Sequence, residues 1–244
     1  MLSCFRFPIW LFALAGCTVY SPTVPSTPLV RKGQVEVVAA MRTLLSLDGS
    51  VAYSPTNHLF FSAEAAIRSG GGNMTVNGMK VPYTDRHRQG SLGIGTYQEF
   101  GPERRFYAAA VGGIGMATVN VHNGLFGQLS EYTASYNKYY TQLYVAQRGS
   151  FVTGGVSLRT TWLDFNQLRL DGAPIEPVTQ FYIEPSFFVQ AGKGALQSQL
   201  TIGISVPARR STAYDSKILA AQSSLVSVGL VFRPGLLREA GAAP

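Results

Sequence analysis

The sequence predicts an all-β chain that forms a closed, antiparallel, up-and-down transmembrane β-barrel of about ten strands, with eight strands as the alternative. Three observations lead to this prediction. Residues of the second half alternate between apolar and polar, which is the period of a strand with one apolar face. Charged residues make up only 14% of the 244 residues, against ~25% in soluble proteins, and no later stretch is long enough for a membrane helix. The predicted connections also alternate between short and long, as they do in membrane barrels.

The N-terminal residues have the three parts of a signal peptide, namely a positive charge at Arg6, an apolar run and small residues before Cys17. The apolar run is too short to span a bilayer, which needs ~20 residues. The stretch Leu14-Ala15-Gly16-Cys17 resembles the lipobox of bacterial lipoproteins. This resemblance implies cleavage before Cys17 and attachment of lipid, palmitate included, to that cysteine, where two or more acyl chains anchor stably. An ordinary signal peptide with an incidental cysteine is the alternative.

Residues 18–28, with the sequence TVYSPTVPSTP, are rich in proline, serine and threonine and have no apolar period. We expect them to form an extended tether between the lipid and the folded domain. The predicted organisation is therefore a signal peptide at 1–16, a lipidated N-terminus and tether at 17–32, the barrel at 33–233 and a C-terminal tail at 234–244.

The clearest predicted hairpin lies between residues 181 and 206. Its two strands, about 181–190 and 196–206, each carry an apolar and a polar face and are joined by the tight turn Ala-Gly-Lys-Gly at 191–194. Each is long enough to cross a bilayer, for which a tilted strand needs ~9–11 residues. The same alternation predicts further strands at about 34–42, 47–53, 58–68, 91–100, 106–121, 139–148, 151–163 and 224–232. The segment 47–53 is the weakest of these, and without it the number of strands would be odd.

The predicted connections follow a regular rhythm. Short turns lie at 54–57, 101–105, 149–150 and 191–194, and long loops lie at about 69–90, 123–137, 164–178 and 209–222. Transmembrane barrels have short periplasmic turns and long extracellular loops. An even number of strands places both chain ends in the periplasm, so a lipid on Cys17 would lie in the inner leaflet of the outer membrane.

The chain as a whole resembles the small outer-membrane β-barrel proteins of Gram-negative bacteria. Its final strand, Val226–Phe232, looks like the C-terminal assembly signal of that family, although here a tail follows the aromatic residue. The lipobox, together with PLVRKGQVEV (28–37) and AYSPTNHL (52–59), resembles barrel lipoproteins of Bacteroidota. The resemblance implies outer-membrane lipids, lipopolysaccharide and other outer-membrane proteins as partners.

The polar faces of the predicted strands indicate what fills the barrel. They place four acids and four bases inside, and these are Glu36, Arg42, Glu64, Arg68, Glu99, Arg148, Arg159 and Glu184. An unpaired charge in a low-dielectric interior is costly, so equal numbers of the two signs indicate mutual pairing. Rings on the same faces, those of Tyr97, Tyr144, Tyr182 and Phe188, add bulk. We expect an occluded interior, with a narrow charge-lined channel as the alternative.

Aromatic residues near the predicted strand ends are typical of the belts at membrane interfaces. Those residues are Tyr107, Tyr139, Tyr140, Trp162, Phe181 and Phe232. The outer loops contain further candidates for contact with a partner, namely Arg86, His87, Arg88, Phe126, Tyr132 and Tyr136.

No motif in the chain predicts catalysis or cofactor binding. The three histidines, His58, His87 and His122, have no recognisable serine, acid or metal-ligand pattern around them. The net charge of +7 is not organised into a nucleic-acid-binding module. We expect a non-enzymatic, lipid-anchored outer-membrane barrel with a structural or interaction role, for example as an accessory subunit of a larger complex, with no cofactor beyond the lipid on Cys17. A lipid-modifying enzyme or protease, a narrow channel and a soluble lipocalin-like carrier are the alternatives.

Overall fold

A computed structural model describes residues 19–42, 46–76, 78–122, 131–176, 179–208 and 223–237. Within these residues the chain is almost entirely β-structure. The strands are β1 (Val35–Arg42), β2 (Ser46–Tyr53), β3 (Leu59–Val76), β4 (Met79–Phe100), β5 (Phe106–His122), β6 (Glu131–Arg148), β7 (Val152–Leu170), β8 (Ala173–Pro174), β9 (Thr179–Ala191), β10 (Leu196–Pro207) and β11 (Ser223–Phe232). One turn of 3₁₀ helix, η2 (Pro102–Arg104), joins β4 to β5. No described helix is long and apolar enough to cross a bilayer.

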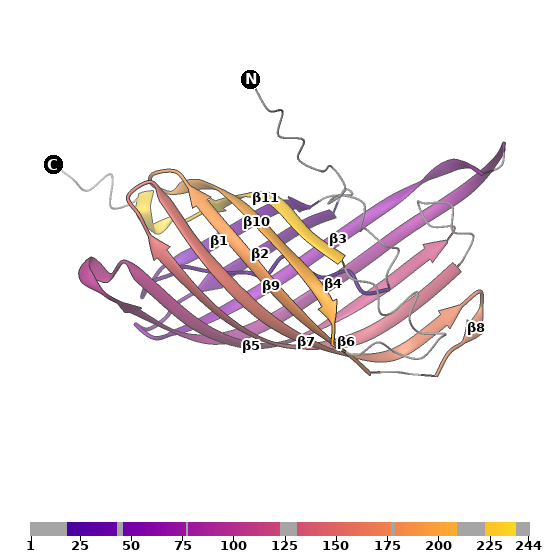
Figure 1. Ribbon diagram of the computed structural model, residues 1–244, viewed down its shortest axis with the longest axis horizontal. Helices are drawn as coiled ribbons and strands as arrows, with labels where there is room; N and C mark the ends of the chain where they lie inside the picture. The colour runs from indigo at the N-terminus through magenta and orange to yellow at the C-terminus, as the bar shows by residue number, and fades with distance from the viewer. Residues whose placement is uncertain are drawn as a thin grey trace, which may run out of the picture.

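Ten of these strands close into one antiparallel barrel, which confirms the predicted fold class and strand number (Figure 1). Each barrel strand pairs with the next one along the chain, and β1 pairs with β11 to close the ring. The short β8 pairs only with the end of β7 and lies outside the ring. The weakest predicted strand is real, because β2 pairs with β1 and β3 along its whole length.

The barrel has two unlike ends. The turns at 54–58, 101–105, 149–151 and 192–195 gather at one end, which we call the short-turn end, together with the start of β1 and the end of β11. The other end is called the distal end. There β3 and β4 continue as a hairpin that projects beyond the other strands (Figure 1).

This hairpin corrects the loop predicted at 69–90, because its residues pair as strands almost to the turn at Gly78. Likewise β6 begins at Glu131 and β7 continues to Leu170, inside segments expected to be long loops. Glycines and polar residues there interrupt the apolar alternation, yet the backbone ladder continues. Without an apolar alternation the sequence of these strand ends resembles a loop.

The faces of the strands are sorted as predicted. Outward-facing side chains are predominantly apolar, and examples are Leu92, Leu143 and Val228, each at least 60% exposed. Inward-facing positions carry most of the charge, including Glu64, Arg159 and Glu184, which are all buried.

The N-terminal described residues fill the lumen, which corrects the expectation of an extended tether. Residues Val19–Val30, called here the lumenal segment, run inside the barrel, and all but Val24 and Ser26 are buried. Val30 packs beside Tyr107 near the short-turn end, whereas Val19 packs among Val119, Val121 and Tyr132 near the distal end. Val19 and the end of β11 therefore lie at opposite ends of the barrel, although β1 and β11 themselves meet at the same end as predicted.

Candidate functional site

The lumen holds a dense group of charged side chains among the described residues, with six acids and six bases around it. All eight predicted interior charges face it, the strands add Asp48, Asp85 and Lys138, and Arg233 follows the end of β11. Glu36 pairs with Arg233, Asp48 with Arg42, Glu64 with Arg159, Asp85 with Arg68, and Glu99 with Arg148. Pairing offsets the cost of taking these charges out of water. Two of the pairs, Glu64–Arg159 and Glu99–Arg148, join members of the predicted set, whereas Glu36, Arg42 and Arg68 pair with residues that were not predicted.

Arg159 on β7 is the centre of the network. Its guanidinium is fully buried, donates to both oxygens of Glu64 and also donates to Gln142 Oε1. It lies over the ring of Tyr140, with 4.6 Å from Cζ to the ring centroid. Its Nη1 donates to Thr23 Oγ1 of the lumenal segment at 3.0 Å. A planar group with five donors can hold wall and segment together in this way.

Glu184 on β9 lies nearer the distal end and is satisfied by hydroxyl groups. Its carboxylate accepts from Thr161 at 2.8 Å, from Ser205 at 2.9 Å and from Tyr20 of the lumenal segment at 2.8 Å. The Tyr20 ring packs against Tyr182, with centroids 4.5 Å apart. One of the three hydroxyl donors to the buried Glu184 carboxylate thus comes from the lumenal segment.

The lumenal segment has no strand partner, so its backbone depends on wall side chains for hydrogen bonds. Carboxylates of Glu36, Asp48 and Glu64 accept the N–H groups of Leu29, Val24 and Ser26, respectively, at 3.0–3.2 Å. Six carbonyls, those of Ser21, Pro22, Ser26, Pro28, Leu29 and Val30, accept from Gln89, Arg42, Gln142, Tyr144, Arg148 and Tyr107, respectively. Buried backbone groups need partners, and here both ion-paired residues, such as Glu64 and Arg148, and neutral ones, such as Gln142, supply them.

Little free space remains beside the lumenal segment. The gap between it and the wall near Asp48 and Gln199 measures about 20 Å³, which is room for about one water molecule. Inward-facing glycines make space for rings, since a Cβ on Gly113 would lie 2.3 Å from Cζ of Tyr140. The predicted interior rings of Tyr97, Tyr144 and Phe188 are buried as expected. Among the described residues, the lumenal segment and these rings fill much of the space inside the wall.

The sequence prediction placed His87 in an exposed outer loop, but the structure buries it. His87 lies on the inner face of β4, where its Nε2 is 2.6 Å from Nη2 of Arg68 and 3.2 Å from Oδ1 of Asp85. Its neighbours Arg86 and Arg88 point outward from the same strand and are exposed. The loop prediction had grouped Arg86, His87 and Arg88 as exposed residues. Because successive residues of a strand point to opposite faces, only the two arginines are exposed.

Two further loop candidates, Tyr132 and Tyr136, lie on β6 and are buried against the lumenal segment rather than exposed. Phe126 and Cys17 lie outside the described residues. Two rings expected in an interfacial belt, those of Tyr107 and Tyr140, also face the lumen.

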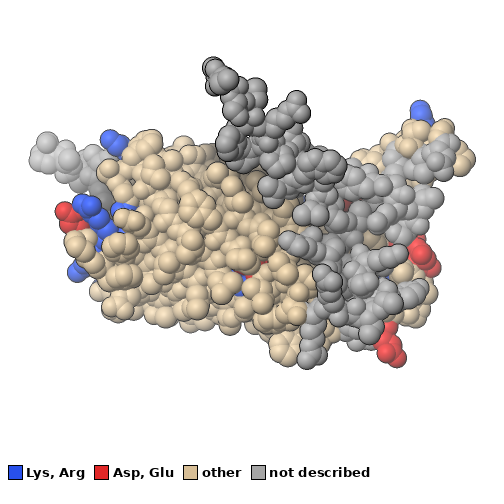
Figure 2. All heavy atoms as spheres, in the orientation of Figure 1, with Lys and Arg blue, Asp and Glu red and all other residues tan. Residues whose placement is uncertain are grey.

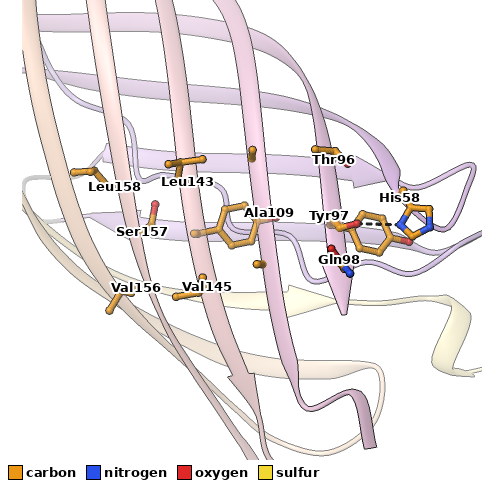
Figure 3. A pocket seen from close by; sticks show the side chains of 13 residues that line it. His58, Thr96, Tyr97, Gln98, Ala109, Leu143, Val145, Val156, Ser157 and Leu158 are labelled. Atoms are coloured by element: carbon orange, nitrogen blue, oxygen red, sulfur yellow. Dashed lines mark hydrogen bonds between the residues drawn. The ribbon is translucent and has the colours of Figure 1, made fainter. Parts of the chain in front are cut away.

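A hollow of about 710 Å³ lies on the outside of the wall, across β4 to β7 (Figure 3). Small residues such as Ala108 and Ala110 form its floor, and Leu143, Val145 and Leu158 stand around it. The ring of Tyr97 points away from this hollow into the lumen, and its carbonyl contacts His58 Nδ1 at 3.3 Å. Polar residues along its edge include His58, Thr96 and Gln98.

Among the residues that the structure describes, no group of three or more His, Cys, Asp or Glu side chains is arranged to hold a metal ion. The geometry defines the class of the protein as a closed ten-stranded antiparallel barrel with a segment of its own chain in the lumen. Comparison with protein-family models finds no match, and comparison with curated proteins finds none either. Its function must therefore be argued from the barrel itself.

Proposed function

We propose that this chain is an outer-membrane barrel that its own lumenal segment keeps closed, and that it has a structural or interaction role rather than an enzymatic one. The observation that carries the proposal is the lumenal segment, which occupies the space that a channel would need. The outer surface and the lumen each support it.

The outer surface is suited to acyl chains. Figure 2 shows uncharged residues over most of the barrel wall, with the visible charged side chains gathered mainly at the two ends. An apolar surface of this extent is rare on soluble proteins, which disfavours a soluble carrier. The outward alternation of apolar residues with an inward polar lumen is the pattern of transmembrane barrels.

Aromatic side chains mark two levels on the outside of the barrel. Tyr139, Trp162 and Phe181 are exposed and lie side by side across β6, β7 and β9. Phe151, immediately before β7, lies near the short-turn end. From Phe151 to Trp162, eleven positions in a strand tilted by ~40° rise about 28 Å. This matches the ~25 Å apolar band between the aromatic girdles of outer-membrane barrels.

Bilayer recording tests the closed state. The intact protein in a planar bilayer should give no stable conductance steps, because the lumenal segment and the wall side chains that contact it occupy the path of an ion through the barrel. A variant that lacks residues 19–30 should conduct. Stable steps from the intact protein would overturn the proposal, as would release of the protein from membranes by a carbonate wash once its lipid has been removed.

Lipid attachment at Cys17 remains part of the proposal, supported by the lipobox. With the projecting β3–β4 hairpin facing outward, the short-turn end is periplasmic and the distal end faces the cell exterior. Val19 lies at the distal end, so the even number of strands does not by itself place the residues before Val19 on the periplasmic side. Lipopolysaccharide and other outer-membrane proteins are the proposed partners of the outer surface, where Arg86 and Arg88 offer exposed positive charge.

A further inference from the structure

The prolines of the lumenal segment are spaced at an interval of three, at Pro22, Pro25 and Pro28. Three residues per turn is the repeat of the polyproline II helix, which has no internal hydrogen bonds and rises ~3.1 Å per residue. Twelve residues of that form span about 34 Å, close to the thickness of a bilayer's hydrocarbon core. The sequence therefore favours an extended form long enough to pass through the barrel.

The hydrogen bonds between the wall and the segment include a set at the same interval, besides others at Ser21, Pro22, Val24, Pro28 and Val30. Tyr20 reaches Glu184, Thr23 reaches Lys138 and Arg159, Ser26 reaches Glu64 and Gln142, and Leu29 reaches Glu36 and Arg148. These four positions form one face of a three-fold helix. The wall places an acid beside Tyr20, Ser26 and Leu29. It places a base beside Thr23 and Leu29, and Arg159, which pairs with Glu64, lies beside Ser26. The wall therefore supplies at least one charged partner at each of these four positions.

Most of the recognition is of backbone atoms. Nine main-chain groups of the segment, three N–H and six C=O, receive wall side chains. Any residue supplies such a carbonyl, and the three prolines remove three N–H groups that would need acceptors. Side-chain recognition by charged groups is limited to the hydroxyls of Tyr20, Ser21 and Thr23. The side chains of Val24 and Thr27 receive no wall hydrogen bond in the structure.

The connection between the segment and β1 is short and accessible. Arg31, Lys32 and Gly33 are all exposed at the short-turn end. A connection of this length holds a ligand at an effective concentration in the millimolar range. For the barrel to be closed, the lumen must bind the segment with a dissociation constant well below that concentration.

From these contacts we propose that the lumen is a peptide-binding site, specific for an extended chain with proline at every third residue and hydroxyls at the positions of Tyr20 and Thr23. The ligand is the lumenal segment itself, and the site accepts the same sequence as a separate peptide, such as that of a second copy. This inference rests on the proposed function, because it requires a barrel whose closed state is due to the segment.

The test cuts the folded protein. A specific protease site inserted between Lys32 and Gly33 allows the connection to be cleaved after the intact barrel has been reconstituted in a planar bilayer. The matched control carries the same site between Glu103 and Arg104, in the exposed turn at η2, where cleavage does not free the segment. Cleavage at the first site should lead to conductance as the segment dissociates, and cleavage at the control site should not.

A synthetic peptide of residues 19–30 should then close the cleaved barrel in a saturable way, half-maximally below about 1 mM. The Tyr20→Phe and Thr23→Val peptides should bind at least about tenfold more weakly, because each loses a hydrogen bond to a charged group. A Val24→Ala, Thr27→Ala peptide should bind within about threefold of the original. A peptide of the same composition with its prolines moved off the interval of three should not close the barrel.

The outcomes separate the two proposals. Conductance of the intact, uncut barrel would overturn the proposed function. If the intact barrel is closed and opens on cleavage, failure of 1 mM peptide to close it, or equal closure by the peptide with displaced prolines, would overturn the binding site alone. If a cleaved barrel kept its segment and took up no fluorescent peptide of residues 19–30 over days, the proposal that the lumen accepts a separate peptide would likewise be overturned.

Discussion

Removal of the charge on Glu64 is the most informative single change in the lumen. Glu64→Gln keeps the size of the side chain but leaves the fully buried guanidinium of Arg159 without its carboxylate. It also weakens the acceptor of the Ser26 N–H in the lumenal segment. Breaking a buried ion pair by removing one partner costs about 3–5 kcal/mol. We expect the free energy of unfolding to fall by that amount.

Two further variants show whether the buried charge is the cause. Glu64→Gln combined with Arg159→Met removes both charges, and an apolar replacement of a buried pair is close to neutral in many proteins. We therefore expect the double variant to regain most of the loss. Glu103→Gln breaks the exposed pair with Arg105 at the short-turn end, and an exposed pair contributes about 0–1 kcal/mol.

Equilibrium urea unfolding of the barrel, refolded in lipid vesicles, measures all three variants against the original chain. The reasoning would be refuted if Glu64→Gln lost no more stability than Glu103→Gln. It would also be refuted if the double variant were at least as unstable as Glu64→Gln, because the loss would then not come from an unpaired charge.

Three further outcomes are expected. Gly113→Ala should lower the stability of the barrel by about 1–3 kcal/mol, since the new methyl group meets the Tyr140 ring at 2.3 Å, whereas Gly112→Ala, with open space around it, should be neutral or slightly stabilising in the same urea titration. Cys17→Ser should abolish labelling of the protein by a radioactive fatty acid, and labelling that persisted would rule out the lipobox. A protease-cleavable tag inserted immediately before Val19 should be cut by protease added to intact cells, and a tag that is cut only after the outer membrane has been opened would reverse the assigned direction of the lumenal segment.

Much of the barrel was predictable because a strand with an apolar outer face and a polar inner face shows its two environments in alternate residues. The pattern Leu196, Leu200, Ile202 and Ile204 faces outward in the structure, with Gln199 and Thr201 buried between. The same period placed Glu64 and Arg159 inside, where they pair. The short turns predicted that the strands on either side of them pair as antiparallel hairpins, and the structure pairs them in this way.

The extensions of the strands were not predictable in this way. Ser69 to Gly72 and the polar run around Asp85 show no apolar alternation although they lie in β3 and β4, as the proposed membrane position would allow for strand ends beyond the bilayer. For this reason His87 and Tyr136 were expected in exposed loops, while the pleat of the extended strands turns both toward the lumen.

The lumenal segment was missed because its composition is that of a linker. Proline, serine and threonine without apolar periodicity indicate a solvated chain when nothing encloses them. The signal that could have revealed it is twofold: prolines recur at an interval of three, and the polar faces of the strands hold Lys138, Gln142 and Gln89, which the predicted ion pairs leave without a role. Both observations are explained once wall side chains serve the backbone of a buried extended segment.

A disulfide between the lumenal segment and the wall tests the central claim most directly. The hydroxyl oxygens of Ser26 and of Ser50 on β2 are 3.1 Å apart, which is close enough for cysteines at these positions to bridge. In native membranes the Ser26→Cys, Ser50→Cys variant should cross-link almost completely under mild oxidation, and the control pair Ser26→Cys, Ser198→Cys, with Ser198 on the outer face, should not. An uncrosslinked Ser26→Cys, Ser50→Cys protein, with the thiol at position 26 open to a bulky water-soluble reagent, would contradict a segment held inside the barrel.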